Sequence, residues 1–133
     1  MRLSLGEGEV LQMRLLVDHD EIHVVTLKCA ILEAAGHIVT AATSAREALE
    51  KLEANIYDAV VTDWLLGDAD GRVVVEAARN KGIPVVVVTA FTAIAYKAPE
   101  PVADLYLEKP VDPEELILIV NALLKKSETP IQD

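Results

Sequence analysis

Short, mostly apolar runs recur along this chain and alternate with longer segments of helical period. The runs lie at 15–17, 38–42, 59–63, 84–89 and 105–107. Several of them are solidly apolar rather than alternating, which is typical of strands that are covered on both faces. Strands that alternate with helices build a parallel sheet with helices on both sides. The pattern predicts an α/β fold with a doubly wound, five-stranded parallel sheet.

The segments between the runs predict amphipathic helices. Helices are expected over 24–35, 45–54 and 73–81, and from 113 onward. Gly36 follows the first helix in the usual C-terminal position. Ser44 and Glu47 form a capping box at the start of the second. Asp112 and Pro113 are typical N-cap and first-turn residues of the last.

Composition limits the classes of function. The chain has 133 residues, of which 52% are hydrophobic, and this fits one domain with a real core. We expect a leader over 1–12, the domain over 13–126 and a polar tail over 127–133. A net charge of −10 argues against nucleic acid as a partner. No apolar run is long enough for a membrane span, and the single Cys29 with no export signal favours a cytoplasmic setting.

Reactive side chains follow the predicted strands. They are Asp18, His19 and Asp20 after the first run, Asp63 at the end of the third, Thr89 at the end of the fourth, and Lys109 after the fifth. The carboxyl ends of parallel strands share one edge of the sheet, so we expect these groups to converge there. Clustered carboxylates repel, so either one of them is neutralised or a cation lies among them, and oxygen ligands of this kind suit Mg²⁺. Asp63 could then attack phosphorus, while Lys109 and Thr89 bind the phosphoryl oxygens.

The same segments resemble the receiver domain of two-component response regulators. The resemblance covers about 13–126 and rests on four motifs in order: LLVDxDEI in 15–22, DxxLxxxDG in 63–71, PVVVVTA in 84–90 and LEKPVDPEEL in 107–116. It implies a CheY-like, stand-alone response regulator that is not an enzyme. Its phosphoacceptor would be Asp63, and its partner a histidine kinase or histidine phosphotransfer protein.

The resemblance also implies roles for individual residues. Thr89 would be the switch hydroxyl, Tyr106 the aromatic side chain that rotates with it, and Lys109 the lysine that binds the phosphoryl group. The backbone carbonyl of Leu65 would join Asp63 and the acids after the first strand as a metal ligand. The Lys109–Pro110 bond would be the cis peptide of the family.

The strand-one acids depart from the family pattern of two adjacent carboxylates, and two registers are possible. In the first, Asp18 holds the first acid position and His19 replaces the second. In the second, His19 and Asp20 occupy the pair and Asp18 lies inside the strand. An ionised carboxylate in a buried strand is costly, so the first register is preferred. Either register puts an imidazole, a poor Mg²⁺ ligand, into the acidic pocket, which predicts weakened Mg²⁺ binding.

Other departures concern the loops. Gly67 stands where the family usually has proline, and Pro99 and Pro101 interrupt the segment that should hold a fourth helix, which we expect to be shortened or replaced by a loop. Trp64 is expected to be partly exposed beside the site, and His37 to lie at the surface or a helix end.

Two functions remain open, and the sequence does not exclude that the chain is a piece of a larger hybrid protein. The first is phosphorylation at Asp63 with signalling through protein contacts. The alternative is a pseudo-receiver, a binding module with an impaired metal site and no phosphorylation. A phosphohydrolase would need a second acid two residues after Asp63, where Leu65 stands.

Overall fold

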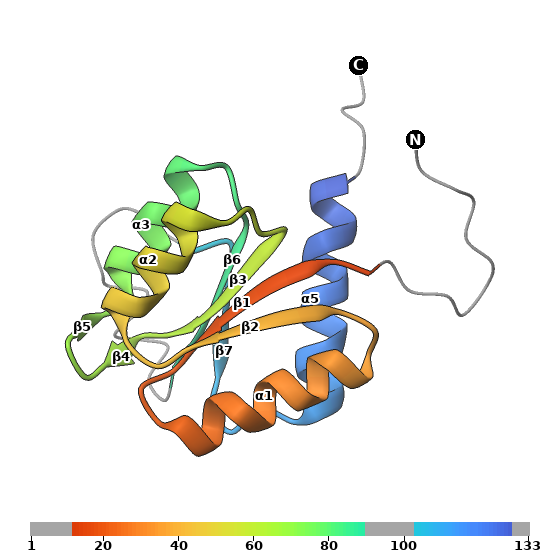
Figure 1. The fold of residues 1–133 in the computed structure, drawn as a ribbon. Coiled ribbons are helices and arrows are strands. Elements are labelled where there is room, and N and C mark those ends of the chain that lie inside the picture. Colours follow the sequence, from red (N-terminus) through yellow and green to blue (C-terminus); the bar gives the residue numbers. More distant parts are fainter. Residues whose placement is uncertain (1–11, 90–102, 129–133) are drawn as a thin grey trace.

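A five-stranded parallel sheet forms the centre of the molecule (Figure 1). The computed structural model describes residues 12–89 and 103–128. The strands are β1 (Arg14–Asp18), β2 (Ile38–Ala42), β3 (Ala59–Asp63), β6 (Val85–Thr89) and β7 (Leu105–Glu108), in the spatial order β2-β1-β3-β6-β7. Neighbouring strands pair in parallel throughout, so the predicted fold class is confirmed.

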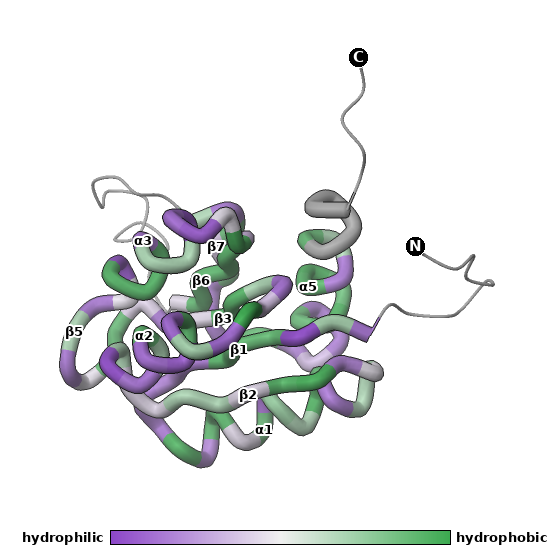
Figure 2. The backbone as a smooth tube through the Cα atoms, turned by 45° about the horizontal axis from the view of Figure 1, so that its top comes forward, coloured by the Kyte–Doolittle hydropathy of each residue, from purple (hydrophilic) through white to green (hydrophobic). Residues whose placement is uncertain are grey.

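Burial along the strands follows their position in the sheet. Every residue of β3 and β6 is buried, as both strands lie inside the sheet, whereas the edge strands β2 and β7 are only partly buried. The tube view shows hydrophobic residues along β1, β3 and β6 (Figure 2). Solidly apolar runs therefore correspond to strands that are covered on both faces.

Helices cover the two faces of the sheet in pairs. The helices are α1 (Ile22–Ala34), α2 (Ala45–Ala54), α3 (Arg72–Asn80) and α5 (Pro113–Glu128). Helices α2 and α3 pack on one face around Leu16, Val60 and Val87, and α1 and α5 pack on the other around Val17, Val61 and Val86. Alternate residues of each strand thus contribute to two separate hydrophobic cores, one on each face of the sheet. The prediction of a shortened fourth helix concerns residues 90–102, which lie outside the described part of the chain.

Helix α2 is held at its N-terminus by two carboxylate side chains and one hydroxyl. Ser44 Oγ accepts a hydrogen bond from the amide of Glu47 at 2.9 Å, as the capping box predicts. The Glu47 carboxylate accepts from the amide and hydroxyl of Thr43, at 2.7 and 3.0 Å. Asp68 accepts from two further amides, those of Ala45 and Arg46, both at 2.9 Å. The first turn of α2 therefore has its amide donors satisfied from within the protein.

Asp68 belongs to a hairpin that the sequence did not predict. The short strands β4 (Leu65–Leu66) and β5 (Ala69–Asp70) pair in antiparallel directly after β3, with Gly67 and Asp68 between them. Gly71 follows, and its amide donates to the carbonyl of Trp64. A Cβ at Gly71 would clash with the backbone carbonyl oxygen of Asp63, so only glycine fits this crossing.

One expectation about burial was wrong. Trp64 is 6% exposed and packs in the core beneath α2 and α3, because it points away from the carboxylate that precedes it. His37 lies just after the end of α1, which is one of the two places expected for it, and it is buried there: its Nδ1 accepts from the amide of Met13 at 3.3 Å, and its Nε2 lies 3.1 Å from Asn121 Oδ1 on α5. These polar partners allow an imidazole to be buried directly after α1.

Helix α5 continues to Glu128, two residues into the predicted tail.

Candidate functional site

Residues at the carboxyl ends of four strands lie along one edge of the sheet. Asp63 ends β3 and Thr89 ends β6, while His19 and Asp20 follow β1 and Lys109 follows β7. The backbone amide of Lys109 donates to the carbonyl of Thr89 at 2.8 Å, which fixes the last connection to the edge. The convergence of these groups, expected from the parallel sheet, is present in the structure.

Asp63 is the centre of the cluster. Its side chain is 5% exposed, and its Oδ2 lies 2.6 Å from Lys109 Nζ and 2.8 Å from His19 Nε2. The other carboxylate oxygen, Oδ1, receives one long contact of 3.4 Å from the amide of Leu65. Among the described residues, the two short contacts are therefore both made by Oδ2. Oδ1 retains most of its capacity to bind a cation or an electrophile.

The hydrogen bonds of His19 assign the tautomer of its ring. The backbone amide of Glu21 donates to Nδ1 at 2.9 Å, so Nδ1 carries the lone pair and Nε2 carries the hydrogen. Nε2–H then donates to Asp63. The lone pair on Nδ1 is that of a neutral ring. Burial lowers the pKa of His19, although the nearby Asp63 carboxylate opposes this shift. Both nitrogens are used within the protein, so His19 acts here as a hydrogen-bond donor to Asp63.

The preferred register of the strand-one acids was wrong. Asp18 is the last residue of β1, where it pairs in register with Ala42 and Thr62 and is wholly buried. Neither of its carboxylate oxygens has a hydrogen-bond partner among the described residues. Burial, reinforced by the carboxylates of Asp68 and Glu47, raises the pKa of Asp18 to about 8. The buried carboxyl is therefore protonated at neutral pH, which avoids the cost of a buried charge that had argued against this register.

The acid pair of the family is thus represented by His19 and Asp20. Ligand atoms of His19, Asp20 and Asp63 all lie within 4.8 Å of one another, and Asp18 is not among them. The metal role that we predicted for Asp18 is therefore corrected. Because both His19 nitrogens are already engaged, the donors left for a cation are the carboxylates of Asp20 and Asp63. Mg²⁺ commonly binds through one or two carboxylates and keeps several waters, so this pair fits the ion.

The remaining predicted residues lie around the cluster. Thr89 is buried at the end of β6. Tyr106 is half-buried in β7, and its hydroxyl accepts from the amide of Ala103 at 3.1 Å. Leu65 follows in β4 with an exposed side chain. The Lys109–Pro110 peptide bond is cis, as predicted. The roles of Thr89 and Tyr106 in switching, and of the Leu65 carbonyl as a ligand, remain predictions.

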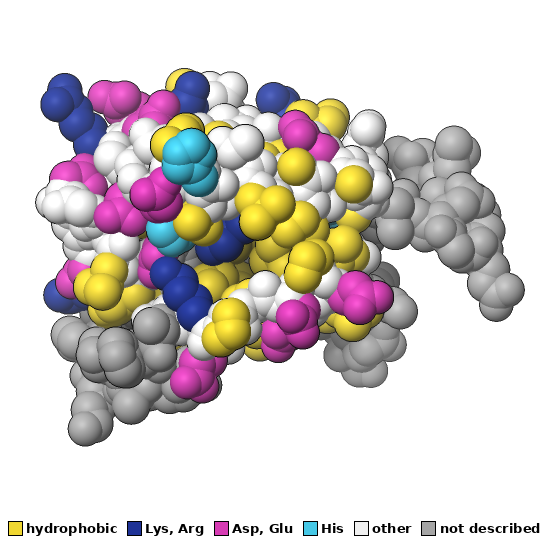
Figure 3. Space-filling view, turned by 90° about the horizontal axis from the view of Figure 1, so that it is seen from below, with side chains coloured by type: hydrophobic (Ala, Val, Ile, Leu, Met, Phe, Trp, Pro, Cys, Tyr) yellow, Lys and Arg dark blue, Asp and Glu magenta, His cyan; other side chains and the backbone are white. Residues whose placement is uncertain are grey.

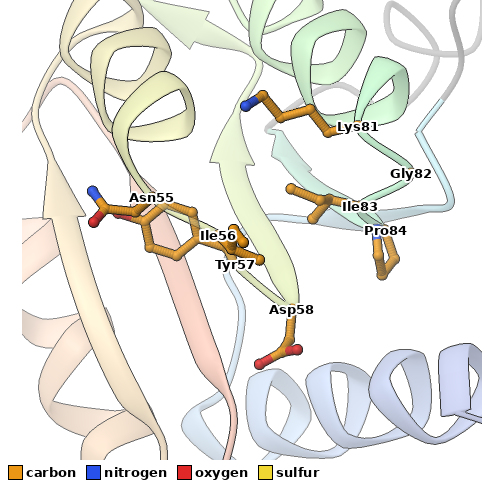
Figure 4. Close-up of a pocket in the computed structure, with 8 residues that line it drawn as sticks. All are labelled: Asn55, Ile56, Tyr57, Asp58, Lys81, Gly82, Ile83 and Pro84. Atoms are coloured by element: carbon orange, nitrogen blue, oxygen red, sulfur yellow. The ribbon is translucent and has the colours of Figure 1, made fainter.

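The opposite edge of the sheet carries a separate hollow. It has a volume of about 490 Å³ and is lined by residues 55–58 and 81–84, which connect α2 to β3 and α3 to β6 (Figure 4). Its lining includes none of the predicted site residues, because it lies at the amino ends of the parallel strands. The candidate site is therefore the carboxyl edge, as expected for an open α/β sheet.

A doubly wound parallel sheet with a carboxylate at the end of β3, an acid after β1 and a lysine after β7 defines a class of protein. The family model described as response regulator receiver domain matches residues 15–121. The chain therefore belongs to the receiver domain family of two-component response regulators.

Individual relatives agree with this assignment. The transcriptional regulatory protein ZraR of Klebsiella oxytoca is 31% identical over 129 residues, which is 92% of this chain and 29% of that protein. The alkaline phosphatase synthesis transcriptional regulatory protein PhoP of Bacillus subtilis is 35% identical over 119 residues, 86% of this chain and 50% of that protein. The chain thus spans half or less of the length of these relatives.

Solved structures are similar over nearly their whole length. The receiver domain of the Francisella response regulator 1452 matches with a TM-score of 0.78 and 30% identity, covering 88% of this chain and 100% of that one. The response regulator TrrA of Thermotoga maritima, in complex with Mg²⁺ and BeF, matches with a TM-score of 0.76 and 27% identity, covering 85% of this chain and 99% of that one. Receiver domains bind Mg²⁺ and are phosphorylated by histidine kinases.

No helix in the described ranges has both the length and the hydropathy of a membrane span.

Proposed function

We propose that Asp63 accepts a phosphoryl group from a histidine kinase or a histidine phosphotransfer protein, and that the domain signals through contacts with another protein. The observation that carries the proposal is the arrangement of Asp63 at the carboxyl edge, 2.6 Å from the Lys109 ammonium and beside Asp20. Membership of the receiver family supports it. Domains of this family are phosphoacceptors and are generally not classed as enzymes.

The charges of the site suit phosphoryl transfer. The Lys109 ammonium and the His19 Nε2–H both face Asp63 Oδ2, and they stabilise the carboxylate as an anion able to attack phosphorus. As the acyl phosphate forms, Lys109 can turn from the carboxylate to the new phosphoryl oxygens, and Thr89 at the end of β6 can donate its hydroxyl to them.

Mg²⁺, held by Asp20 and Asp63 with the Leu65 carbonyl as a further candidate, would neutralise charge on the phosphoryl group. Without a cation, Asp20 would repel the incoming phosphate, since it remains next to Asp63. The first acid of the family's pair is replaced by the neutral His19, so the site carries one negative charge fewer than usual and should hold Mg²⁺ less tightly.

Mass spectrometry after treatment with acetyl phosphate and Mg²⁺ tests the proposal. We expect the mass of one phosphoryl group to be added to the wild type and not to Asp63→Asn. Asp70→Asn is the matched control, because Asp70 is an exposed acid in β5 and should leave phosphorylation unchanged. Equal labelling of the wild type and Asp63→Asn would refute the assignment of Asp63.

A pseudo-receiver is the second candidate, and the hydrogen bond from His19 to Asp63 favours it. This bond occupies Oδ2, one of the two carboxylate oxygens, and the imidazole replaces an acid of the family. If intact wild-type protein takes up no phosphoryl group from acetyl phosphate or a panel of histidine kinases, the pseudo-receiver is the better description.

A further inference from the structure

A second cavity lies between α1 and the start of α5, next to the phosphoacceptor cluster. Its volume is about 720 Å³, in the range of pockets that bind small organic ligands. The residues that line it come from the β1–α1 connection, α1, the end of β6, the β7–α5 connection and the start of α5: His19, His23, Val24, Leu27, Lys28, Ile31, Val88, Lys109, Pro110, Val111, Pro113 and Leu116. Figure 3 shows this face, where apolar side chains border a recess that contains Lys or Arg atoms.

Lys28 is one of two lysines in a cavity that is lined mostly by apolar side chains, the other being Lys109. The Nζ of Lys28 is buried and has no hydrogen-bond partner among the described residues. Burial lowers the pKa of Lys28 to about 8, so the group is still mainly charged at neutral pH. An unpaired buried ammonium is costly, and an anion that bonds to it recovers much of that cost. The ammonium of Lys109 differs in this respect, because it already forms an ion pair with Asp63.

The rest of the lining requires an apolar partner. Val24, Leu27 and Ile31 form one wall along α1, and Val111 and Leu116 form the other. Leu27 is 61% exposed, although it belongs to a helix that packs on the sheet, so this wall has nothing described that covers it. Apolar walls around a single unpaired cation select a molecule with an apolar chain and a single anionic end.

The charge at the site also decides which anion fits. Of the two ammonium groups in the lining, only that of Lys28 has no partner among the described residues, and Asp63 and Asp20 lie nearby. A dianionic phosphate would bring one uncompensated charge into this region, whereas a carboxylate is matched by Lys28 alone. The chain as a whole carries −10, so general attraction of anions to the surface is excluded as the reason for binding.

We propose that this cavity binds a small monocarboxylate with an apolar chain, its carboxylate bonded to Lys28 Nζ and its chain lying between α1 and the start of α5. The occupant would also contact His19 and Lys109, since both line the cavity, and so would touch the residues that face Asp63. The proposal concerns a separate ligand and does not depend on phosphorylation.

Calorimetry with octanoate, and with 1-octanol as its uncharged counterpart, tests the proposal on the full chain. We expect saturable binding of octanoate that is at least about tenfold tighter than that of 1-octanol, since a charge-assisted hydrogen bond is gained. Lys28→Met should remove this preference. Lys81→Met, which removes an exposed lysine far from the cavity, should keep it. Equal binding of both compounds to the wild type would refute the role of Lys28.

A second variant tests the apolar wall. Leu27→Glu places a carboxylate at an exposed position of the lining, so the fold should be retained while octanoate binding is lost through repulsion and a blocked wall. Chemical shifts of the α1 amides, followed by NMR during the titration, locate the ligand. Undiminished binding to Leu27→Glu, or shifts confined to another face, would place the ligand elsewhere and overturn the proposal.

Discussion

Replacing Asp18 by valine should stabilise the protein, and the gain should grow with pH. Asp18 is wholly buried at the end of β1 with neither carboxylate oxygen bonded among the described residues. Burial and the neighbouring carboxylates of Asp68, Glu47, Asp63 and Asp20 raise its pKa from 3.8 to about 8. In the unfolded chain Asp18 loses its proton near pH 4, but in the folded protein it keeps it until about pH 8. Raising the pH through this window therefore favours unfolding.

The magnitude follows from this window. Each pH unit between the two pKa values costs about 1.4 kcal/mol, so the three units from pH 4 to pH 7 correspond to at most about 4 kcal/mol. Screening of the surrounding carboxylates by salt and relaxation around the side chain reduce this figure. We expect Asp18→Val to raise the free energy of unfolding by about 2–4 kcal/mol at pH 7, with a smaller gain at pH 5.

Urea unfolding at pH 5 and pH 7.5, in the presence of a chelator, measures this effect. Asp18→Asn is the matched control, because it has the same shape and a buried polar group but no titration. Both variants should lack the loss of stability that the wild type shows between these two pH values. A raised pKa of Asp18 requires the difference in unfolding free energy between Asp18→Val and the wild type to grow as the pH rises. A difference that stays constant between pH 5 and pH 7.5 would refute the reasoning.

Three other substitutions test separate features. Gly71→Ala should destabilise the fold by roughly 2 kcal/mol or more, because its Cβ meets a backbone carbonyl at the end of β3, whereas Gly67→Ala should have little effect on urea unfolding; equal losses would contradict this. Hydrogen bonds from the α2 amides lower the pKa of Asp68, so the ionised side chain stabilises the fold above about pH 4 and less so in stronger acid. The melting temperature of Asp68→Asn should therefore lie below that of the wild type at neutral pH, and the difference should shrink as the pH falls below about 4. A difference that does not change with pH would refute this prediction. His19→Asp should tighten Mg²⁺ binding about tenfold by calorimetry, whereas His23→Asp, outside the acidic cluster, should not.

Much of the fold could be predicted from local pattern. The capping box at Ser44 defined the start of α2 because its two side chains act within four residues. The wholly buried strands β3 and β6 were recognisable because each begins with a run of at least three consecutive apolar residues. The convergence of Asp63 and Lys109 followed from the topology, since parallel strands end at one edge.

What could not be predicted depends on partners that are distant in the sequence. Whether Asp18 lies inside or outside β1 depends on its protonation, which the carboxylates from α2 and the hairpin help to set. The role of His19 required the position of the Glu21 amide, which assigns the hydrogen to Nε2. The burial of Trp64 depended on the path of the β4–β5 hairpin, and two-residue strands carry too short a pattern to be recognised.

The two hydrogen bonds from α2 to Asp68 connect that helix mechanically to the chain segment that follows Asp63. Only four residues separate Asp63 from Asp68, so a displacement of the segment after β3 must either carry the first turn of α2 with it or break both bonds. The amides of Ala45 and Arg46 are thereby natural reporters of events at the site. Their rates of hydrogen exchange would register a movement of the hairpin even if the sheet itself stayed rigid.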